Sequence, residues 1–309
     1  MKAPRNKTID VSAENGKMYL ERCVREAEIS ENIRDCVIAG DMFSAGVKLP
    51  EGFADLMIAD PPYNLDKDFG TGKFRKMSDD DYETYTENWV KAVFPLLRDG
   101  ASVYVCCDWK SSSAIEHVLK KYFVVRNRIT WQREKGRGAL SNWKNGMEDI
   151  WFATKGRDYT FNADAVKVRR RVVAPYKKDG MPKDWEKTEN GNFRNTYPSN
   201  FWDDISVPYW SMPENTAHPT QKPEKLLAKL ILASSNEGDT VFDPFLGSGS
   251  TAVTAKKLGR HFVGIEKNEQ YCVWAQIRLE AAETDNSIQG YEDGVFWERN
   301  TSAYIKKRR

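Results

Sequence analysis

The chain has 309 residues, a hydrophobic fraction of 40%, an aromatic fraction of 12% and ten Trp. This composition excludes disordered, collagenous and disulfide-scaffold proteins, and the length allows one large domain or one domain carrying a second module. The five Cys include no C-x-x-C pair, which predicts reduced core thiols and no metal site. No apolar run approaches the ~20 residues of a membrane span, and the first residues lack the apolar core of a signal peptide, so a cytoplasmic protein is expected.

The net charge of +2 is distributed unevenly. Residues 126–187 contain 16 Lys or Arg against 8 Asp or Glu, a local charge of +8 that leaves −6 for the rest. Charge alone does not distinguish a polyanion-binding segment from a solvated basic surface. Aromatic residues interleaved with the cations favour nucleic acid, because rings stack on bases while cations meet phosphates. These are Trp131, Trp143, Trp151, Tyr159 and Trp185.

The first 131 residues alternate between strand and helix patterns. Apolar runs at 35–40 and 54–59 are typical of buried parallel strands. Apolar residues recur at helical spacing between 79 and 97, a strand pattern follows at 101–107, and residues 112–121 and 122–131 predict a helix and a strand. This alternation indicates an α/β fold with a largely parallel sheet.

The middle of the chain differs from both flanks. Residues 132–217 are rich in Asn, Gly, Pro, Lys and Arg, with short apolar pieces at 149–153 and 172–174, and they predict an inserted, loop-rich module. Alternation then resumes. The predicted elements are helices at 224–234, 251–258 and 269–282 and strands at 240–242 and 261–266. We therefore expect two halves of one α/β domain, at 1–131 and 218–285, separated by the module at 132–217 and followed by a tail at 286–309.

A glycine-rich turn lies between a predicted strand and a predicted helix. Gly247, Gly249 and Ala252 satisfy G-x-G-x-x-A, in which glycines permit a tight turn and close backbone approach to a ligand at a helix amino terminus. Glu266 ends the next strand, where a carboxylate can accept both hydroxyls of a ribose. Together they predict an adenosine-containing ligand, but they do not separate a dinucleotide from S-adenosylmethionine, and a plain structural turn is the alternative.

The tetrapeptide Asp60-Pro61-Pro62-Tyr63 follows another predicted strand, at the edge where ligands bind in open α/β sheets. Two prolines fix the backbone, so the Pro61 carbonyl can be presented rigidly beside the Asp60 carboxylate. Such a pair of acceptors suits an amino group with two N–H donors, and Tyr63 supplies a ring to stack on the base that bears it. The alternative is a Pro-rich turn without chemistry.

Three motifs in chain order resemble the amino-methylating DNA methyltransferases of the circularly permuted beta group. They are the tetrapeptide at 60–63, His-Pro-Thr-Gln-Lys-Pro at 218–223 and Asp-Pro-Phe-Leu-Gly-Ser-Gly at 243–249. In that group the catalytic motif precedes the target-recognition region, and the cofactor loop comes last. The resemblance implies a Rossmann-like methyltransferase fold with a mostly parallel seven-stranded sheet, S-adenosylmethionine as methyl donor, duplex DNA as substrate, and a target-recognition module at 132–217.

The resemblance also implies roles for individual residues. Asp60, Pro61, Pro62 and Tyr63 are expected to hold the target amine and its base. The expected cofactor-binding residues are Asp41 near the adenine, Thr220 and Lys222 at the methionine carboxylate, Glu266 at the ribose, and Asp243, Phe245, Gly247, Ser248 and Gly249 in the loop. The sequence order therefore predicts a catalytic half at 1–131 and a cofactor-binding half at 218–285.

An exocyclic nitrogen is a poor nucleophile because its lone pair is delocalised into the ring, and two acceptors would draw it towards tetrahedral geometry without a covalent intermediate. Carbon-5 cytosine methylation requires a thiolate in a Pro-Cys dipeptide, and none of the five Cys follows a proline. N4-cytosine methylation shares the amine chemistry, but that group more often has Ser at the place of Asp60. Site-specific N6-adenine methylation of a flipped-out base is therefore expected, with N4-cytosine as the alternative.

Two other classes of protein account for fewer of these residues. A nicotinamide-dependent oxidoreductase leaves the tetrapeptide and the basic segment unexplained, and a catalytically silent DNA-binding regulator would have lost the tetrapeptide. The expected DNA contacts are Arg133, Lys135, Arg137, Arg169, Arg170 and Arg171. The sequence leaves open the recognition sequence, a homodimer, and a cognate restriction endonuclease for the same site.

Overall fold

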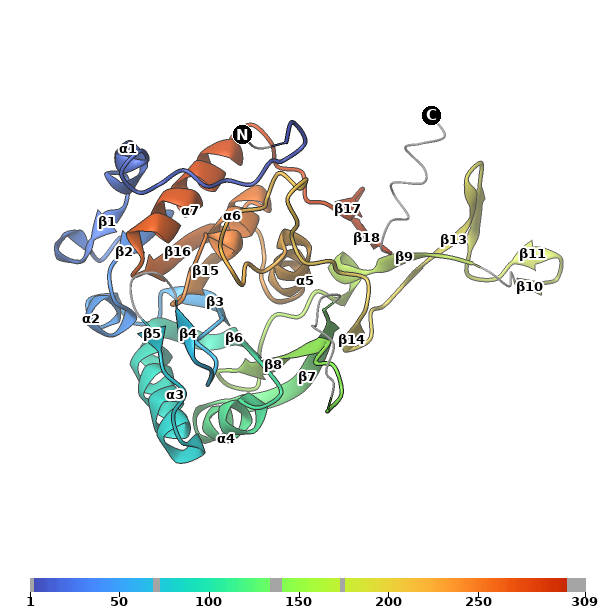
Figure 1. The fold of residues 1–309 in the computed structure, drawn as a ribbon. Coiled ribbons are helices and arrows are strands. Elements are labelled where there is room, and N and C mark those ends of the chain that lie inside the picture. The colour runs from blue at the N-terminus through green and yellow to red at the C-terminus, as the bar shows by residue number, and fades with distance from the viewer. Residues whose placement is uncertain (1–2, 69–72, 134–140, 173–175, 299–309) are drawn as a thin grey trace.

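Figure 1 shows the computed structural model, which describes residues 3–68, 73–133, 141–172 and 176–298. Within these residues the largest sheet has nine strands in the order β1-β2-β16-β15-β3-β6-β8-β7-β14. Neighbouring strands are parallel, except that β8 is antiparallel to β6 and β7. The strands are β1 (Val24–Arg25), β2 (Cys36–Ala39), β3 (Ala54–Ala59), β6 (Leu97–Cys107), β7 (Val124–Gln132), β8 (Met147–Thr154), β14 (Phe201–Trp202), β15 (Thr240–Asp243) and β16 (His261–Glu266). The predicted α/β fold with a mostly parallel sheet is confirmed.

Helices cover both faces of this central sheet, with α3 and α4 below it and α6 and α7 above it in Figure 1. One face packs on α2 (Met42–Gly46), α3 (Asp79–Val93) and α4 (Ser112–Tyr122). The other packs on α1 (Lys17–Leu20), α5 (Glu224–Ser234), α6 (Ser250–Lys257) and α7 (Glu269–Ala281). Side chains alternate between the faces, so Val37 and Ile38, adjacent in β2, belong to different apolar cores. This explains why the strand sequences are continuously apolar.

No helix in the described ranges is long and apolar enough to cross a membrane.

The sheet differs from the expected seven strands because the two-residue strands β1 and β14 extend its two edges. The structure also differs from the boundary expected at residue 132 between the α/β domain and the inserted module. Strand β8 lies inside the central sheet, because Ile150 and Phe152 pack into one core while Trp151 and Ala153 pack into the other. The apolar piece expected in the inserted module is thus a core strand.

A second sheet of five short strands lies beside the central one, in the order β12-β13-β9-β18-β17. Its strands are β12 (Glu186–Thr188), β13 (Gly191–Thr196), β9 (Val168–Arg171), β18 (Val295–Trp297) and β17 (Tyr291–Glu292). In Figure 1 this sheet and the hairpin of β10 (Lys177–Lys178) and β11 (Met181–Pro182) extend away from the body. Because β18 pairs with β9, part of the tail expected at 286–309 belongs to the same layer as the module.

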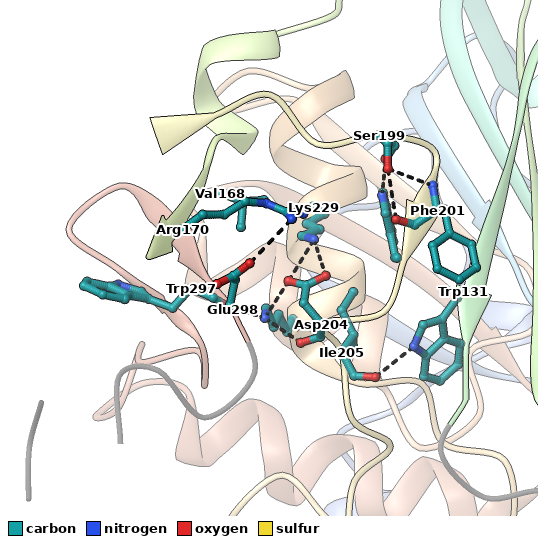
Figure 2. Close-up of polar contacts among 12 residues, drawn as sticks. Trp131, Val168, Arg170, Ser199, Phe201, Asp204, Ile205, Lys229, Trp297 and Glu298 are labelled. Carbon is teal, nitrogen blue, oxygen red and sulfur yellow. Dashed lines mark hydrogen bonds and ion pairs between the residues drawn. The ribbon is translucent and has the colours of Figure 1, made fainter. Parts of the chain in front are cut away.

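Buried ion pairs fix the segment after β14 to helix α5 (Figure 2). The Asp204 carboxylate accepts hydrogen bonds from the Lys229 ammonium at 2.9 and 3.1 Å and pairs with Lys225 at 2.8 Å. Burial opposes the charge of Asp204, yet the two lysines lower its pKa below the usual value. Nearby, the Trp131 indole donates to the Ile205 carbonyl at 3.0 Å. Lys225 also donates to the Trp297 carbonyl of β18 at 2.6 Å, so α5 is bonded to the second sheet as well.

Three short 3-10 turns and a small hairpin complete the described structure: η1 (Glu26–Glu28), η2 (Phe94–Leu96), η3 (Ala163–Val166), β4 (Lys67–Asp68) and β5 (Lys73–Phe74). The β4–β5 hairpin follows the tetrapeptide at 60–63 directly. Lys67 and Phe74 from this hairpin line the cavity described below. The hairpin therefore forms part of its wall.

Candidate active site

A cavity of about 420 Å³ lies at the carboxyl edge of the central sheet. The segments that follow four neighbouring strands line it: 40–43 after β2, 60–63 after β3, 243–248 after β15 and 266–268 after β16. The segment 218–222 closes another side. The three motifs, far apart in sequence, thus surround one space. Its volume lies within the range of small-molecule and cofactor sites.

The glycine-rich turn is held by Glu266. One carboxylate oxygen accepts from the Gly247 N–H at 2.7 Å, and the other accepts from the Asn268 N–H at 2.7 Å. Burial raises the pKa of Glu266 to about 7 despite these bonds. Gly247 has φ of 57°, and a Cβ there would lie 3.2 Å from a ring nitrogen of His218. A side chain at Gly247 would therefore intrude between the loop and His218.

Asp243 is a buried acid of the site. It is only 4% exposed, and its Oδ1 accepts from the Phe245 N–H at 2.9 Å. Burial raises the pKa of Asp243 to about 7, although a hydrogen bond with Thr251 acts in the opposite direction. The loop is also supported from behind, where buried Arg278 donates to the Ser248 carbonyl at 2.8 Å. Asp243 and Ser248 both line the cavity, and their contact with a cofactor stays a prediction.

Gly249 has a different place. It is not among the residues that line the cavity, and it begins α6 in the left-handed conformation with φ of 83°. A Cβ at this position would stand 2.6 Å from the Ala275 Cβ of α7. Close packing of α6 on α7 therefore requires the glycine, while contact of Gly249 with a cofactor stays a prediction.

The tetrapeptide places a hydrogen-bonded acid in the cavity. The Tyr63 hydroxyl donates to Asp60 Oδ1 at 2.8 Å, and the Lys222 ammonium donates to Asp60 Oδ2 at 2.5 Å. Burial raises the pKa of Tyr63 well above its usual value, and Asp60 and Glu148 add to the effect. The carbonyl of Pro62 accepts from the Tyr82 hydroxyl at 3.0 Å, which fixes the turn. Both oxygens of Asp60 are thus engaged by protein donors.

Lys222 does not stand free for the methionine carboxylate that the sequence suggests. Its ammonium lies 3.4 Å from Glu148 Oε2 and 3.2 Å from the Tyr63 hydroxyl as well as against Asp60. Burial disfavours its charge, yet Asp60 and Glu148 raise the pKa of Lys222 above its usual value. A fully charged ammonium is therefore buried at the centre of the site.

The rest of this motif also reaches the cavity. The Thr220 N–H donates to His218 Nδ1 at 3.3 Å, and the His218 ring meets Tyr271 edge-on with centroids 4.4 Å apart. Burial lowers the pKa of His218 to about 4, so the imidazole is neutral at pH 7. On the opposite side, Asp41 caps α2 through the Phe43 N–H at 3.0 Å and pairs with Lys267 at 3.0 Å. Asp41, Thr220 and Phe245 line the cavity.

A family model described as DNA methylase, of the N6 and N4 type, matches residues 54–276. The chain belongs to this family. This methylase is 34% identical over 261 residues to the Type II methyltransferase M.HpaI of Haemophilus parainfluenzae, covering 83% of this chain and 76% of that relative. It is also 34% identical over 254 residues to the DNA adenine methyltransferase YhdJ of Escherichia coli, covering 80% and 83%. The sequence-based recognition of an amino-methylating DNA methyltransferase is confirmed.

Solved structures are similar in fold. PvuII DNA methyltransferase (cytosine-N4-specific) gives a TM-score of 0.58 at 15% identity, over 84% of this methylase and 89% of that chain. A putative DNA modification methylase of Thermus thermophilus, complexed with S-adenosylmethionine, gives 0.54 at 21% identity, over 86% and 98%. At these identities the likeness concerns the fold, and it supports the expected Rossmann-like methyltransferase architecture.

The candidate DNA contacts of the methylase have unequal surroundings. Arg169 lies over the Phe193 and Trp297 rings, 5.2 and 5.5 Å from their centroids, and donates to Asn195. This packing makes Arg169 a structural residue of the second sheet. Arg170 pairs with Glu298 at 3.5 Å (Figure 2), and Arg171 is exposed. Arg133 pairs with Glu148 at the edge of the active site, whereas Lys135 and Arg137 lie outside the described residues.

Sequence reasoning missed Glu148. This carboxylate is 3% exposed, is the second residue of β8 and contacts Arg133, Lys222 and Tyr63. A signal was present, because Glu148 and Asp149 are two acids at the start of an otherwise apolar run. Buried carboxylates in such runs need partners, and functional sites are a common place to find them.

Proposed function

We propose that this protein is a DNA methyltransferase that transfers a methyl group from S-adenosylmethionine to N6 of adenine in duplex DNA. One observation carries the proposal: the Asp60 tetrapeptide and the Gly247–Glu266 loop line the same cavity. A site for an amine and a site for an adenosine-type ligand are thus adjacent. Adenine is favoured as the target because one relative of this chain is a DNA adenine methyltransferase.

The residues present fit S-adenosylmethionine. Gly247 gives a backbone cradle that a Cβ would partly fill, and Glu266 presents carboxylate oxygens to the cavity with lone pairs beyond those used by the two N–H groups. Phe245 and Tyr271 offer apolar walls, and Asp41 stands at the other end. When bound, S-adenosylmethionine supplies an electrophilic methyl group.

The chain's own residues prepare the nucleophile. Asp60 and the Pro61 carbonyl would each accept one N–H of the target amine, so that the nitrogen lone pair is directed away from the ring plane. The rate then comes from orientation and from preorganised acceptors in a site shielded from water. Tyr63, whose hydroxyl is fixed by Asp60, keeps its ring at the cavity wall, where it would stack on the base. The target atom lies inside a duplex, so the base must be flipped out.

The test replaces Asp60 by Ala. Methyl transfer to duplex DNA should be lost, while S-adenosylmethionine should bind with nearly the affinity of the parent, because Asp60 faces the amine. Incorporation of labelled methyl groups and calorimetric titration measure the two quantities. Asp66→Asn is the matched control, because Asp66 is an exposed acid of the next turn that bonds the Lys76 N–H and does not line the cavity. Parallel loss of binding and activity in the Asp60 variant would place Asp60 in the cofactor site instead.

The product defines the target. Hydrolysis of methylated DNA to its free bases should yield N6-methyladenine, and N4-methylcytosine would overturn the choice of base. Sequencing of the modified positions gives the recognition site. Resistance of that DNA to an endonuclease acting on the same site tests a modification role, and sedimentation tests a homodimer.

A further inference from the structure

Both oxygens of the acceptor that the target amine needs already accept a hydrogen bond in the structure, and one of the two donors is a cation. Lys222 donates to Asp60 Oδ2 at 2.5 Å and Tyr63 donates to Oδ1 at 2.8 Å. We propose that Lys222 masks Asp60 in the free enzyme, and that Glu148 is the positioning residue that draws Lys222 away when the target base enters. This inference rests on the proposed function, because it presumes that Asp60 receives an amine.

A neutral amine cannot displace Lys222 unaided. An ammonium–carboxylate bond is charge-assisted and about twice as strong as a bond between neutral groups. The Lys222 side chain is 8% exposed, so water cannot replace Asp60 as its partner without opening the site. A second buried anion that takes Lys222 would therefore free the full charge of Asp60 for an N–H of the base.

Glu148 meets this requirement. Its Oε2 lies 3.4 Å from the Lys222 ammonium, slightly beyond hydrogen-bond length, and its side chain is 4% exposed. The cluster contains two carboxylates, Asp60 and Glu148, and two cations, Lys222 and Arg133, and Lys67 of the cavity wall lies within electrostatic range of all four. A small shift of the ammonium from Asp60 to Glu148 keeps every charge paired.

Arg133 connects this shift to DNA. Arg133 follows β7 directly, pairs with the other oxygen of Glu148 and is 32% exposed. Its buried Nε has no hydrogen-bond partner among the described residues, so the guanidinium is only partly satisfied by Glu148. A phosphate that takes over Arg133 would leave Glu148 with an uncompensated charge, which attracts Lys222. DNA binding would then unmask Asp60 at the moment it is needed.

The test is a pair of variants with a rescue. Glu148→Gln keeps the shape but removes the anion, so Lys222 stays on Asp60 and the single-turnover rate of methyl transfer should fall by on the order of a hundredfold. Binding of S-adenosylmethionine, measured by calorimetry, should not change. Adding Lys222→Met removes the mask, and the double variant should transfer methyl groups about tenfold faster than Glu148→Gln alone. If Glu148 only stabilised the fold, the second buried replacement, Lys222→Met, would not restore the rate of methyl transfer.

Asp149→Asn is the matched control, because Asp149 is equally buried, adjacent in β8 and bonded instead to Ser112 and Thr130. Lys222→Met should give no rescue in that background. A parental rate in Glu148→Gln, or a double variant no faster than Glu148→Gln, overturns the inference. If the parent protein methylates adenine in the same assays, the proposed function survives that result. Absence of methyl transfer by the parent would instead refute the proposed function.

Discussion

Asp243 should make the free enzyme less stable as the pH rises. Its native pKa of about 7 compares with about 3.9 for an unperturbed Asp. Because the folded state holds this proton more tightly than the unfolded state, the contribution of Asp243 to stability is most favourable below about pH 4 and is lost as the pH approaches 7. Asp243→Asn keeps an acceptor for the Phe245 N–H and removes the buried charge.

The size of the effect follows from the shift. The pKa of Asp243 is raised by about 3, and each pKa unit corresponds to ~1.36 kcal/mol. Ionised Asp243 therefore lowers the unfolding free energy of the parent by at most about 4 kcal/mol at pH 8. At pH 5 only the unfolded state is largely ionised, and the same relation gives about 1.6 kcal/mol. The gain in unfolding free energy of Asp243→Asn over the parent should therefore be about 2–3 kcal/mol larger at pH 8 than at pH 5.

Urea unfolding of both proteins without cofactor, at the two pH values, measures this difference. Asp204→Asn is the control of opposite sign, because Lys229 and Lys225 lower the pKa of Asp204. That variant should be less stable than the parent at pH 8, and the deficit should shrink in acid as Asp204 is protonated. An Asp243→Asn gain that is equal at pH 5 and pH 8 would refute the argument that burial raises the pKa of this acid.

Four further variants test three separate parts of the molecule. Glu266→Ala should weaken S-adenosylmethionine binding by about 1–3 kcal/mol in calorimetry, and unchanged affinity would exclude Glu266 from the cofactor site. Gly249→Val should lower the free energy of unfolding in urea by about 1–3 kcal/mol, because the new Cβ would clash with Ala275 and because Gly249 has a positive φ. A variant as stable as the parent would contradict this packing. Arg171→Gln should make the slope of log DNA affinity against log salt concentration less steep by about 0.9. Arg169→Gln should instead mainly lower thermal stability, because Arg169 packs on aromatic rings. The same effects in both variants would contradict the different roles given to the two arginines.

The local sequence pattern determined many of the secondary-structure elements and two of the motifs of this protein. The helices at α5 and α7 and the strands at β3 and β16 lie within a residue or two of their predicted bounds, because each combines a continuous period with a clear stop. The tetrapeptide at 60–63 and the glycine-rich loop also came from sequence, since both are short motifs at strand ends. The rule that ligands bind at the carboxyl edge of parallel strands explains why the structure places both motifs around one cavity.

Only the tertiary structure decided which side chains meet. Pairing of β8 with β6 and β7 turned a segment expected in the module into a core strand and brought Glu148 to the site of Asp60 and Lys222. Pairing of β9 with β18 set Arg169 against aromatic rings while its neighbour Arg171 faces solvent. Local sequence specifies the period of an element, but the partner of a side chain depends on strand order and register, which arise from burial summed over distant parts of the chain.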